Sequence, residues 1–284
     1  MKDAWVLFRA TRSGPAGLVV LGVVVAAALL APWLADSEAL RAVNTVANPV
    51  WAGPGDWAPL GTDNLGRPIW VQLLFGARIS LLVGVASTAV AIGIGLTVGL
   101  VAGFIGGWVD ALLARFSEWF LVIPFIPLAI VLAAVLGPSL KNIIVVIGIT
   151  SWPVTARLIR AQVLTLKERL YVERSRVLGA SSVGAMVRHV LPNAMPLVIA
   201  NTTLTVPIAI LSETTLAFLG LGDPTRVSWG KMLEESFEAG SLTREAWWYY
   251  APPGVCVVIV VLAFTMVGRA LETVLDPRLR ERRA

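Results

Sequence analysis

The stretch "RLIRAQVLTLKERLYVERSRVLGASSVGAMVRHVLPN" at residues 157–193 is a polar interruption in a sequence that is otherwise mostly apolar, and it carries seven Lys/Arg residues. Residues 171–178 read as two helical turns, because Tyr171, Ser175 and Leu178 fall on one side at i, i+4 and i+7. Gly179 is expected to break this helix, since glycine is the residue that most often ends one.

A second helix is predicted directly after this glycine. Ser181 or Ser182 can cap its first turn, and Pro192 is expected to stop it. The expected apolar stripe on this second helix consists of Val183, Met186, Val187, Val190 and Leu191. A helix, a glycine corner and an amphipathic helix together have the form of a docking element for a soluble partner. The alternative is a basic loop that rests on anionic lipid.

The composition places this docking element on a membrane protein. The chain has 284 residues, of which 57% are hydrophobic and 14% charged, with a mean hydropathy of +0.78, and this is too apolar for a soluble domain of that size. The single cysteine, Cys256, excludes an intrachain disulfide, and the single histidine, His189, excludes a histidine-cluster metal site. A pI near 9.9 could suggest nucleic acid, but the basic residues lie between apolar spans, so we expect no nucleic-acid partner.

The pattern predicts an all-α polytopic protein with six transmembrane helices. The first, at 16–35, follows an N-terminal segment at 1–15 and is expected to be a transmembrane helix that is not cleaved off as a signal peptide. In the second, glycines recur every four residues at Gly95, Gly99 and Gly103, which favours close packing against a neighbouring helix. The uncharged spans lie at 16–35, 79–107, 119–137, 142–156, from 190 onward, and at 246–268. Because 190–222 is too long for one crossing, we expect its helix to end near Glu213 and the following residues to form a short outer or re-entrant segment.

The distribution of Lys and Arg predicts which side is cytoplasmic. Six spans place both termini on one side, and that side then holds 16 of the 23 Lys/Arg residues, so it is expected to be the inside. The predicted cytoplasmic parts are 1–15, the loop 157–193 between helices 4 and 5, and the tail 271–284. The segments 36–78 and 214–245 are then extracytoplasmic, and 79–270 forms the permease core.

The motif "YVERSRVLGAS" at 171–181, followed by "LPN" at 191–193, resembles the EAA loop of ABC importer permeases. Glu173, Gly179, Ala180 and Ser181 match its pattern, although Arg174 and Ser175 replace the alanines that name it. The resemblance implies a coupling helix that seats in a cleft of a cytoplasmic ATPase. The ATPase-docking residues it implies are Tyr171, Glu173, Arg174, Ser175, Arg176, Leu178, Gly179, Ala180 and Ser181.

Further motifs resemble the peptide/nickel importer permeases, specifically the shorter of two paired permease subunits. They are "PLGTDNLGRPIWVQLLFGARISLLVG" (59–84), "SETTLAFLGLG" (212–222), "SWGKML" (228–233) and "MVGRALETVLDPRLR" (266–280). The resemblance implies a second homologous permease, two P-loop ATPase subunits that bind ATP and Mg, and an extracytoplasmic solute-binding protein. In the first motif, the residues Gly61, Asp63, Asn64 and Gly66 are turn formers that would tie down the chain before the second span.

No catalytic chemistry is expected in this chain. It lacks a G-x-x-x-x-G-K-[ST] loop, an H-E-x-x-H motif and paired cysteines, so it should bind no cofactor or metal itself, and any ATP hydrolysis belongs to partner subunits. An intramembrane enzyme is disfavoured because no nucleophile has a base beside it. An ion-gradient transporter would need an ionisable residue inside the membrane, and Glu213 is the one candidate. Glu213 either lines the solute path or is a helix-end charge bonded to its neighbours.

The cargo is left open among di- or oligopeptides, nickel complexes and oligosaccharides, with peptides preferred.

Overall fold

Five helices in the computed structural model are long and apolar enough to cross a membrane, or up to six if one bent pair of helices counts as a single span. The structure describes residues 7–40, 49–55 and 58–275. Within these residues the chain is helical and forms no strand, apart from one isolated bridge between Thr62 and Pro68. The chain is thus the all-helical, multi-pass membrane protein that the sequence predicts.

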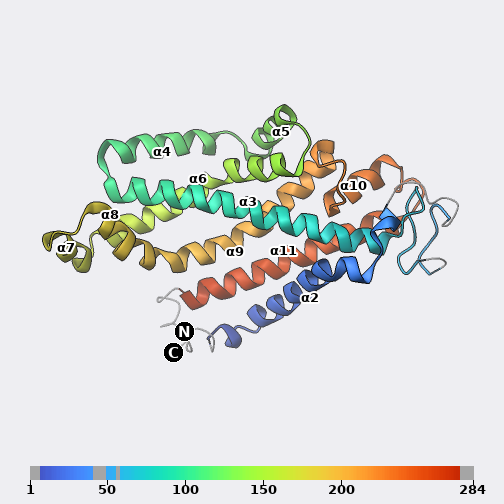
Figure 1. The fold of residues 1–284 in the computed structure, drawn as a ribbon, viewed down its shortest axis with the longest axis horizontal. Coiled ribbons are helices and arrows are strands. Elements are labelled where there is room, and N and C mark those ends of the chain that lie inside the picture. The colour runs from blue at the N-terminus through green and yellow to red at the C-terminus, as the bar shows by residue number, and fades with distance from the viewer. Residues whose placement is uncertain (1–6, 41–48, 56–57, 276–284) are drawn as a thin grey trace.

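The helices in chain order are α2 (Ser13–Leu34), η1 (Ser37–Leu40), α3 (Ile69–Ile105), α4 (Gly107–Val122), α5 (Phe125–Leu136), α6 (Leu140–Lys167), α7 (Leu170–Val177), α8 (Ser182–Ala185), the π-helical turn η2 (Met186–Val190), α9 (Leu191–Leu216), the π-helical turn η3 (Ala217–Leu221), α10 (Trp229–Glu238) and α11 (Trp247–Leu275). Figure 1 shows α7 and α8 at one end of the long axis, beyond the first turn of α2 and the last turn of α11, with α10 at the opposite end.

The predicted second and fourth spans are the two helices that pack most extensively, α3 and α6. The predicted glycine face makes this possible. A Cβ built on Gly95 would lie 2.8 Å from the carbonyl oxygen of Trp152, and one built on Gly99 would lie 2.7 Å from that of Ala156. The expectation that these glycines admit a neighbouring backbone is therefore confirmed.

The predicted third span is not one straight helix. Its residues belong to α4 and α5, whose axes differ by 89° across a short break. Pro124 precedes α5 with φ −57° and ψ 128°. Ile123 is also extended, because the helical conformation is disfavoured for a residue that precedes proline. The two extended residues separate α4 from α5.

The predicted fifth span is longer at both ends than the sequence suggested. A helical segment of 40 residues, Ser182–Leu221, passes Glu213 without interruption and is kinked only near its end, so the expectation that the helix ends near Glu213 is wrong. No glycine or proline lies between Glu213 and Gly220, and the first break is Gly220 with φ 79°. At about 60 Å the segment must project beyond a hydrocarbon core of about 30 Å.

Pro192 does not stop the second helix of the docking element, contrary to expectation. The π-helical turn directly before it is wider than an α-turn, and the Leu191 N–H bonds the carbonyl of Met186. Pro192 follows as the second residue of α9, so the wider turn before it accommodates its ring and its missing N–H. The predicted loop at 157–193 is also shorter than expected, because α6 continues through Arg160 to Lys167.

Candidate functional site

The turn from α7 to α8, at the far end of the molecule (Figure 1), is built as a glycine-capped helix end. Gly179 has φ 91°, and the Ala180 N–H donates to the Ser175 carbonyl over 3.0 Å. Of the two hydrogen bonds in a Schellman motif, this is the one that spans more residues. The Ser181 hydroxyl then accepts from the Gly184 N–H at 3.1 Å, so Ser181 caps α8. The predicted corner and cap are confirmed.

Apolar side chains are exposed on this corner while one residue anchors it. Leu178 is 86% exposed, Val177 82% and Leu170 68%, whereas Val172 is fully buried. Val172 packs in a cluster with Ile159 of α6, together with residues of α3, α8 and α9. The corner is thus held on the bundle from one side and presents apolar surface on the other, which is typical of a surface that another protein covers.

Most of the predicted docking residues line two hollows beside each other. One, of about 510 Å³, is lined by Tyr171, Arg174, Ser175, Leu178, Gly179, Ala180 and His189. The other, of about 350 Å³, is lined by Glu173, Arg174, Val177 and Leu178. Arg174 and Leu178 stand between the two hollows. Arg176 lies in α7 with them, and its side chain is outside the described part of the structure.

The predicted apolar stripe of the second helix is only half correct. Val183 and Val187 are 65% and 51% exposed, while Val190 is fully buried. The buried positions instead include Ala185 and Ala194, which flank the π-helical turn. One extra residue in that turn rotates the helix face, so spacing counted at 3.6 residues per turn misplaces the stripe.

An ion pair joins α4 to α6. Nη2 of Arg160 donates to Oδ2 of Asp110 over 2.7 Å, and its Nε donates to the other carboxylate oxygen. This bidentate arrangement is the strongest geometry for such a pair.

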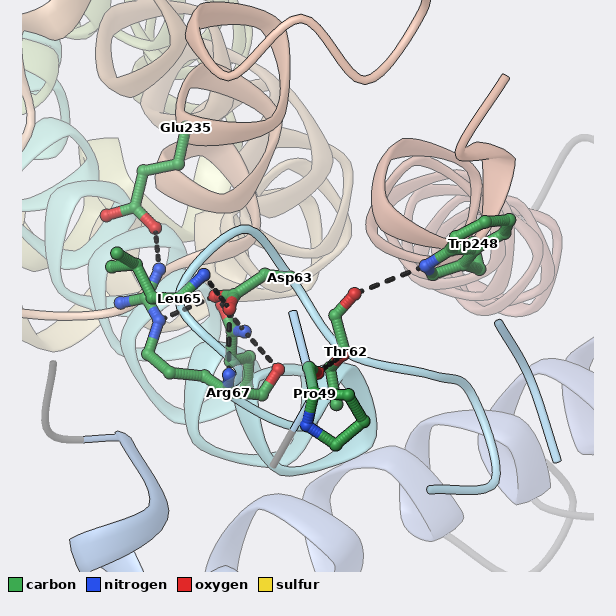
Figure 2. A network of polar contacts seen from close by, with 8 residues as sticks. Pro49, Thr62, Asp63, Leu65, Arg67, Glu235 and Trp248 are labelled. Carbon is green, nitrogen blue, oxygen red and sulfur yellow. Dashed lines mark hydrogen bonds and ion pairs between the residues drawn. The ribbon is translucent and has the colours of Figure 1, made fainter. Parts of the chain in front are cut away.

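A second polar network ties down the opposite end of the molecule (Figure 2). Both oxygens of Asp63 are used: Oδ1 accepts from the Leu65 and Arg67 N–H groups at 2.8 Å, and Oδ2 accepts from Arg67 Nε at 2.6 Å and Gln72 Nε2 at 2.9 Å. Nη2 of Arg67 also donates to Oε2 of Glu235 on α10 at 2.5 Å. The predicted tie before the second span is therefore present, with Glu235 and Gln72 as members that sequence reasoning missed.

The charge state of Arg67 follows from these neighbours. Burial by itself lowers the pKa of its guanidinium, but the charges of Asp63 and Glu235 and the hydrogen bonds to them outweigh burial and raise the pKa above its usual range. Arg67 is thus a permanent positive charge held between two carboxylates.

A third helix contacts the same segment. The Trp248 Nε1–H of α11 donates to the Thr62 carbonyl at 3.2 Å (Figure 2). Side chains of α3, α10 and α11 therefore all hydrogen-bond to residues 61–68.

Glu213 lies in a polar contact between helices and not on the wall of the cavities described here. It is 2% exposed, and its Oε2 accepts from the Ser80 hydroxyl at 3.1 Å. Ser80 in turn accepts the Trp229 N–H. The carboxyl group therefore joins α3, α9 and the start of α10.

The described residues contain neither a metal-binding cluster nor a cysteine pair. No group of three or more His, Cys, Asp or Glu residues there could hold a metal ion, and Cys256 is a free thiol that is partly buried in α11.

The fold and these two ends define a helical membrane permease component, and sequence comparison gives its family. Residues 95–281 match the binding-protein-dependent transport system inner membrane component family. The chain is 38% identical over 285 residues to a di/tripeptide transport system permease protein of Pseudomonas aeruginosa, covering 99% of this chain and 93% of that protein. It is 36% identical over 283 residues to an oligopeptide transport system permease protein of Bacillus subtilis, covering 99% and 90%. A putative peptide transport system permease protein of Brucella suis is 36% identical over 270 residues, covering 95% and 89%.

The chain belongs to this family of membrane permeases, in its peptide-transport branch.

Proposed function

We propose that this chain is one of two permease subunits of an ATP-driven importer and that it forms half of the path for di- or oligopeptides. The observation that carries the proposal is the corner between α7 and α8. It protrudes beyond the ends of α2 and α11 (Figure 1), and it exposes Val177 and Leu178 almost completely. An exposed apolar surface of this kind is typical of a site that a partner protein covers.

The partner that fits the corner is a cytoplasmic P-loop ATPase, which binds the ATP and Mg that this chain has no motif to hold. The docking set is Tyr171, Glu173, Arg174, Ser175, Arg176, Leu178, Gly179, Ala180 and Ser181. Two such ATPases, a second homologous permease and an extracytoplasmic solute-binding protein complete the proposed assembly. Both termini and the corner lie on the cytoplasmic side, in keeping with the excess of Lys and Arg there.

Peptide cargo is proposed because the similar proteins are named as di/tripeptide and oligopeptide permeases. Nickel complexes and oligosaccharides are the alternative cargoes of such an importer. An ion-gradient transporter is the alternative mechanism, and it is disfavoured because Glu213 is buried and already hydrogen-bonded to Ser80. We propose that Glu213 stabilises the contact between α3 and α9 and does not line the solute path.

The test is purification of the tagged chain from cells that express its neighbouring genes, followed by reconstitution in lipid vesicles. ATPase subunits should copurify, and labelled peptide should accumulate only when ATP, Mg and a binding protein are present. Accumulation driven by an ion gradient without ATP would overturn the mechanism. Uptake of labelled nickel or oligosaccharide without peptide uptake would overturn the cargo alone.

A further inference from the structure

An apolar pocket opens between α2, α3 and the loop 225–227, toward the end of the molecule that carries α10. Its volume is about 760 Å³, in the range of pockets that bind drug-sized ligands. Val25 and Leu29 of α2 form one wall and Leu82 and Val85 of α3 form another. Two arginines, Arg78 and Arg226, stand in this otherwise apolar lining.

These two arginines differ from three other basic residues at the same end, Arg67, Lys231 and Arg244. Arg67 and Lys231 form ion pairs, and Arg244 lies over a tryptophan ring at 5.1 Å. Arg78 and Arg226 are both exposed, and within the described ranges neither side chain has an ion pair or a hydrogen bond. The pocket therefore holds two guanidinium groups whose donors are available.

The carboxylate that could serve Arg226 is already engaged. Asp223 interacts electrostatically with Arg226 but forms no ion pair with it. One oxygen of Asp223 accepts from the Leu140 N–H at 3.1 Å, and the other accepts from the N–H and hydroxyl of Thr225 at 2.9 and 2.6 Å. Asp223 thus holds its own turn and the start of α6, and it leaves the guanidinium of Arg226 to another anion.

The depth of the pocket points to a lipid. Arg78 is the last charged residue before the uncharged stretch 79–107 of α3, so it marks the edge of the hydrocarbon core. Trp33, 82% exposed at the end of α2, lies about one turn beyond Leu29, where an interfacial aromatic residue is expected. Neither guanidinium has an ion-pair partner among the described residues at this level, and an anion that carries an acyl chain satisfies both the arginines and the apolar walls.

We propose that this pocket binds an anionic phospholipid of the leaflet on the α10 side. Its phosphate lies between Arg78 and Arg226, and an acyl chain follows the walls formed by α2 and α3. Basic pockets between transmembrane helices favour anionic over zwitterionic headgroups, because the zwitterion carries its own positive charge into the site. The proposal requires only that the chain spans the membrane, so it stands apart from the proposed cargo and from ATPase docking.

The test measures lipids retained by the full chain with the subunits that copurify with it. The protein is equilibrated in mixed micelles of phosphatidylglycerol and phosphatidylcholine in equal amounts, and bound lipids are counted by native mass spectrometry. The wild-type protein should retain phosphatidylglycerol, and the double variant R78Q/R226Q should lose about tenfold or more of that binding. R78K/R226K should restore most of it. The matched control is K141Q, which removes an exposed charge at the same end but outside the pocket.

Three results would overturn the proposal. The first is equal retention of phosphatidylglycerol by the wild type and by R78Q/R226Q, when both elute at the same volume in size-exclusion chromatography and are therefore equally well assembled. The second is displacement of the lipid by an equal concentration of inorganic phosphate, since the arginines would then take a free anion. The third is a disulfide between L29C, in a Cys256→Ser background, and a cysteine placed on another subunit, which would show that protein fills the pocket.

Discussion

The hydroxyl of Ser80 on α3 donates a hydrogen bond of 3.1 Å to Oε2 of Glu213 on α9, across 133 residues of sequence. The same hydroxyl accepts the N–H of Trp229, the first residue of α10. A buried carboxyl group is costly unless hydrogen bonds satisfy it, and here they come from the elements that must be held together. Glu213 therefore fastens α3 and α9 to the start of α10.

Glu213→Gln should leave assembly and uptake near wild type, because the amide oxygen can still accept the Ser80 hydroxyl. Glu213→Leu leaves the buried Ser80 hydroxyl without this acceptor. It should lower the free energy of unfolding by about 1–3 kcal/mol. Thermal unfolding of the purified complex and uptake in vesicles measure the two effects. Lost uptake in a normally assembled Glu213→Gln complex would instead show that the side chain serves the solute path.

The ion pair between Arg67 and Glu235 should stabilise the end of the molecule that carries α10. Glu235→Gln removes one carboxylate from an arginine whose side chain is 8% exposed, and loss of one partner from a buried ion pair costs about 3–5 kcal/mol. Because Glu235 itself is 27% exposed, solvent should reduce this cost to about 1–3 kcal/mol. Limited proteolysis within residues 49–68 should become faster. Glu238→Gln, an exposed change one turn away on α10, is the control and should have no effect.

Gly99 should not tolerate a side chain, whereas Gly93 on the same helix should. A Cβ on Gly99 meets the Ala156 carbonyl oxygen at 2.7 Å, and a Cβ on Gly93 meets no atom within 4 Å. Gly99→Val should therefore separate α3 from α6 and reduce the yield of folded protein in detergent, with a cost of about 1–3 kcal/mol or more. Gly93→Val is the matched control. If Gly93→Val were equally harmful, that face of α3 would be covered by another subunit.

The spacing of small residues and the turn chemistry could be predicted because both are local. Gly95 and Gly99 signalled close helix packing, and Gly179 signalled the corner. The contact between Arg67 and Glu235 joins residues 168 apart, and no single sequence shows which carboxylate a buried arginine will meet. Hydropathy also did not predict the bend at Pro124, because α4 and α5 taken together are as apolar as a single transmembrane span.

The extent of α9 was mispredicted for a different physical reason. Length and charge suggested a break near Glu213, but a buried carboxyl group with hydrogen-bond partners does not end a helix. At the other end, the π-helical turn before Pro192 admits a proline that the sequence pattern reads as a stop. Both errors arise where tertiary contacts or an irregular turn satisfy groups that sequence reasoning leaves unpaired.

The side of the membrane occupied by the corner can be tested directly. Ser182 is exposed at the start of α8, so Ser182→Cys in a Cys256→Ser background offers a single reactive thiol. The excess of Lys and Arg predicts that this thiol is cytoplasmic. An impermeant maleimide should therefore label it in inverted vesicles and not in intact cells. Labelling in intact cells would reverse the topology.

Gly179→Val should separate the ATPase from an otherwise intact permease. No atom lies within 4 Å of a Cβ built on Gly179, so the effect cannot be a steric clash with a neighbour. It comes from φ 91°, which costs a side chain about 1–2 kcal/mol and is relieved when the corner rotates. The exposed Val177 and Leu178 then turn away from their seat. Glu173→Ala should act in the same direction but more mildly, by removing one exposed charge.

The matched control is Gly240→Val, because Gly240 also has positive φ, 71°, and open space around its Cβ, but lies at the opposite end of the molecule. Its strain should be similar, and ATPase association should be unchanged. Gly179→Asn provides a second control, since asparagine tolerates this backbone conformation better than valine does. Reconstituted complexes of each variant should be compared for ATPase content, hydrolysis and uptake. If Gly179→Val matched wild type in all three, the corner would be an ordinary basic surface and would not transmit the ATPase stroke.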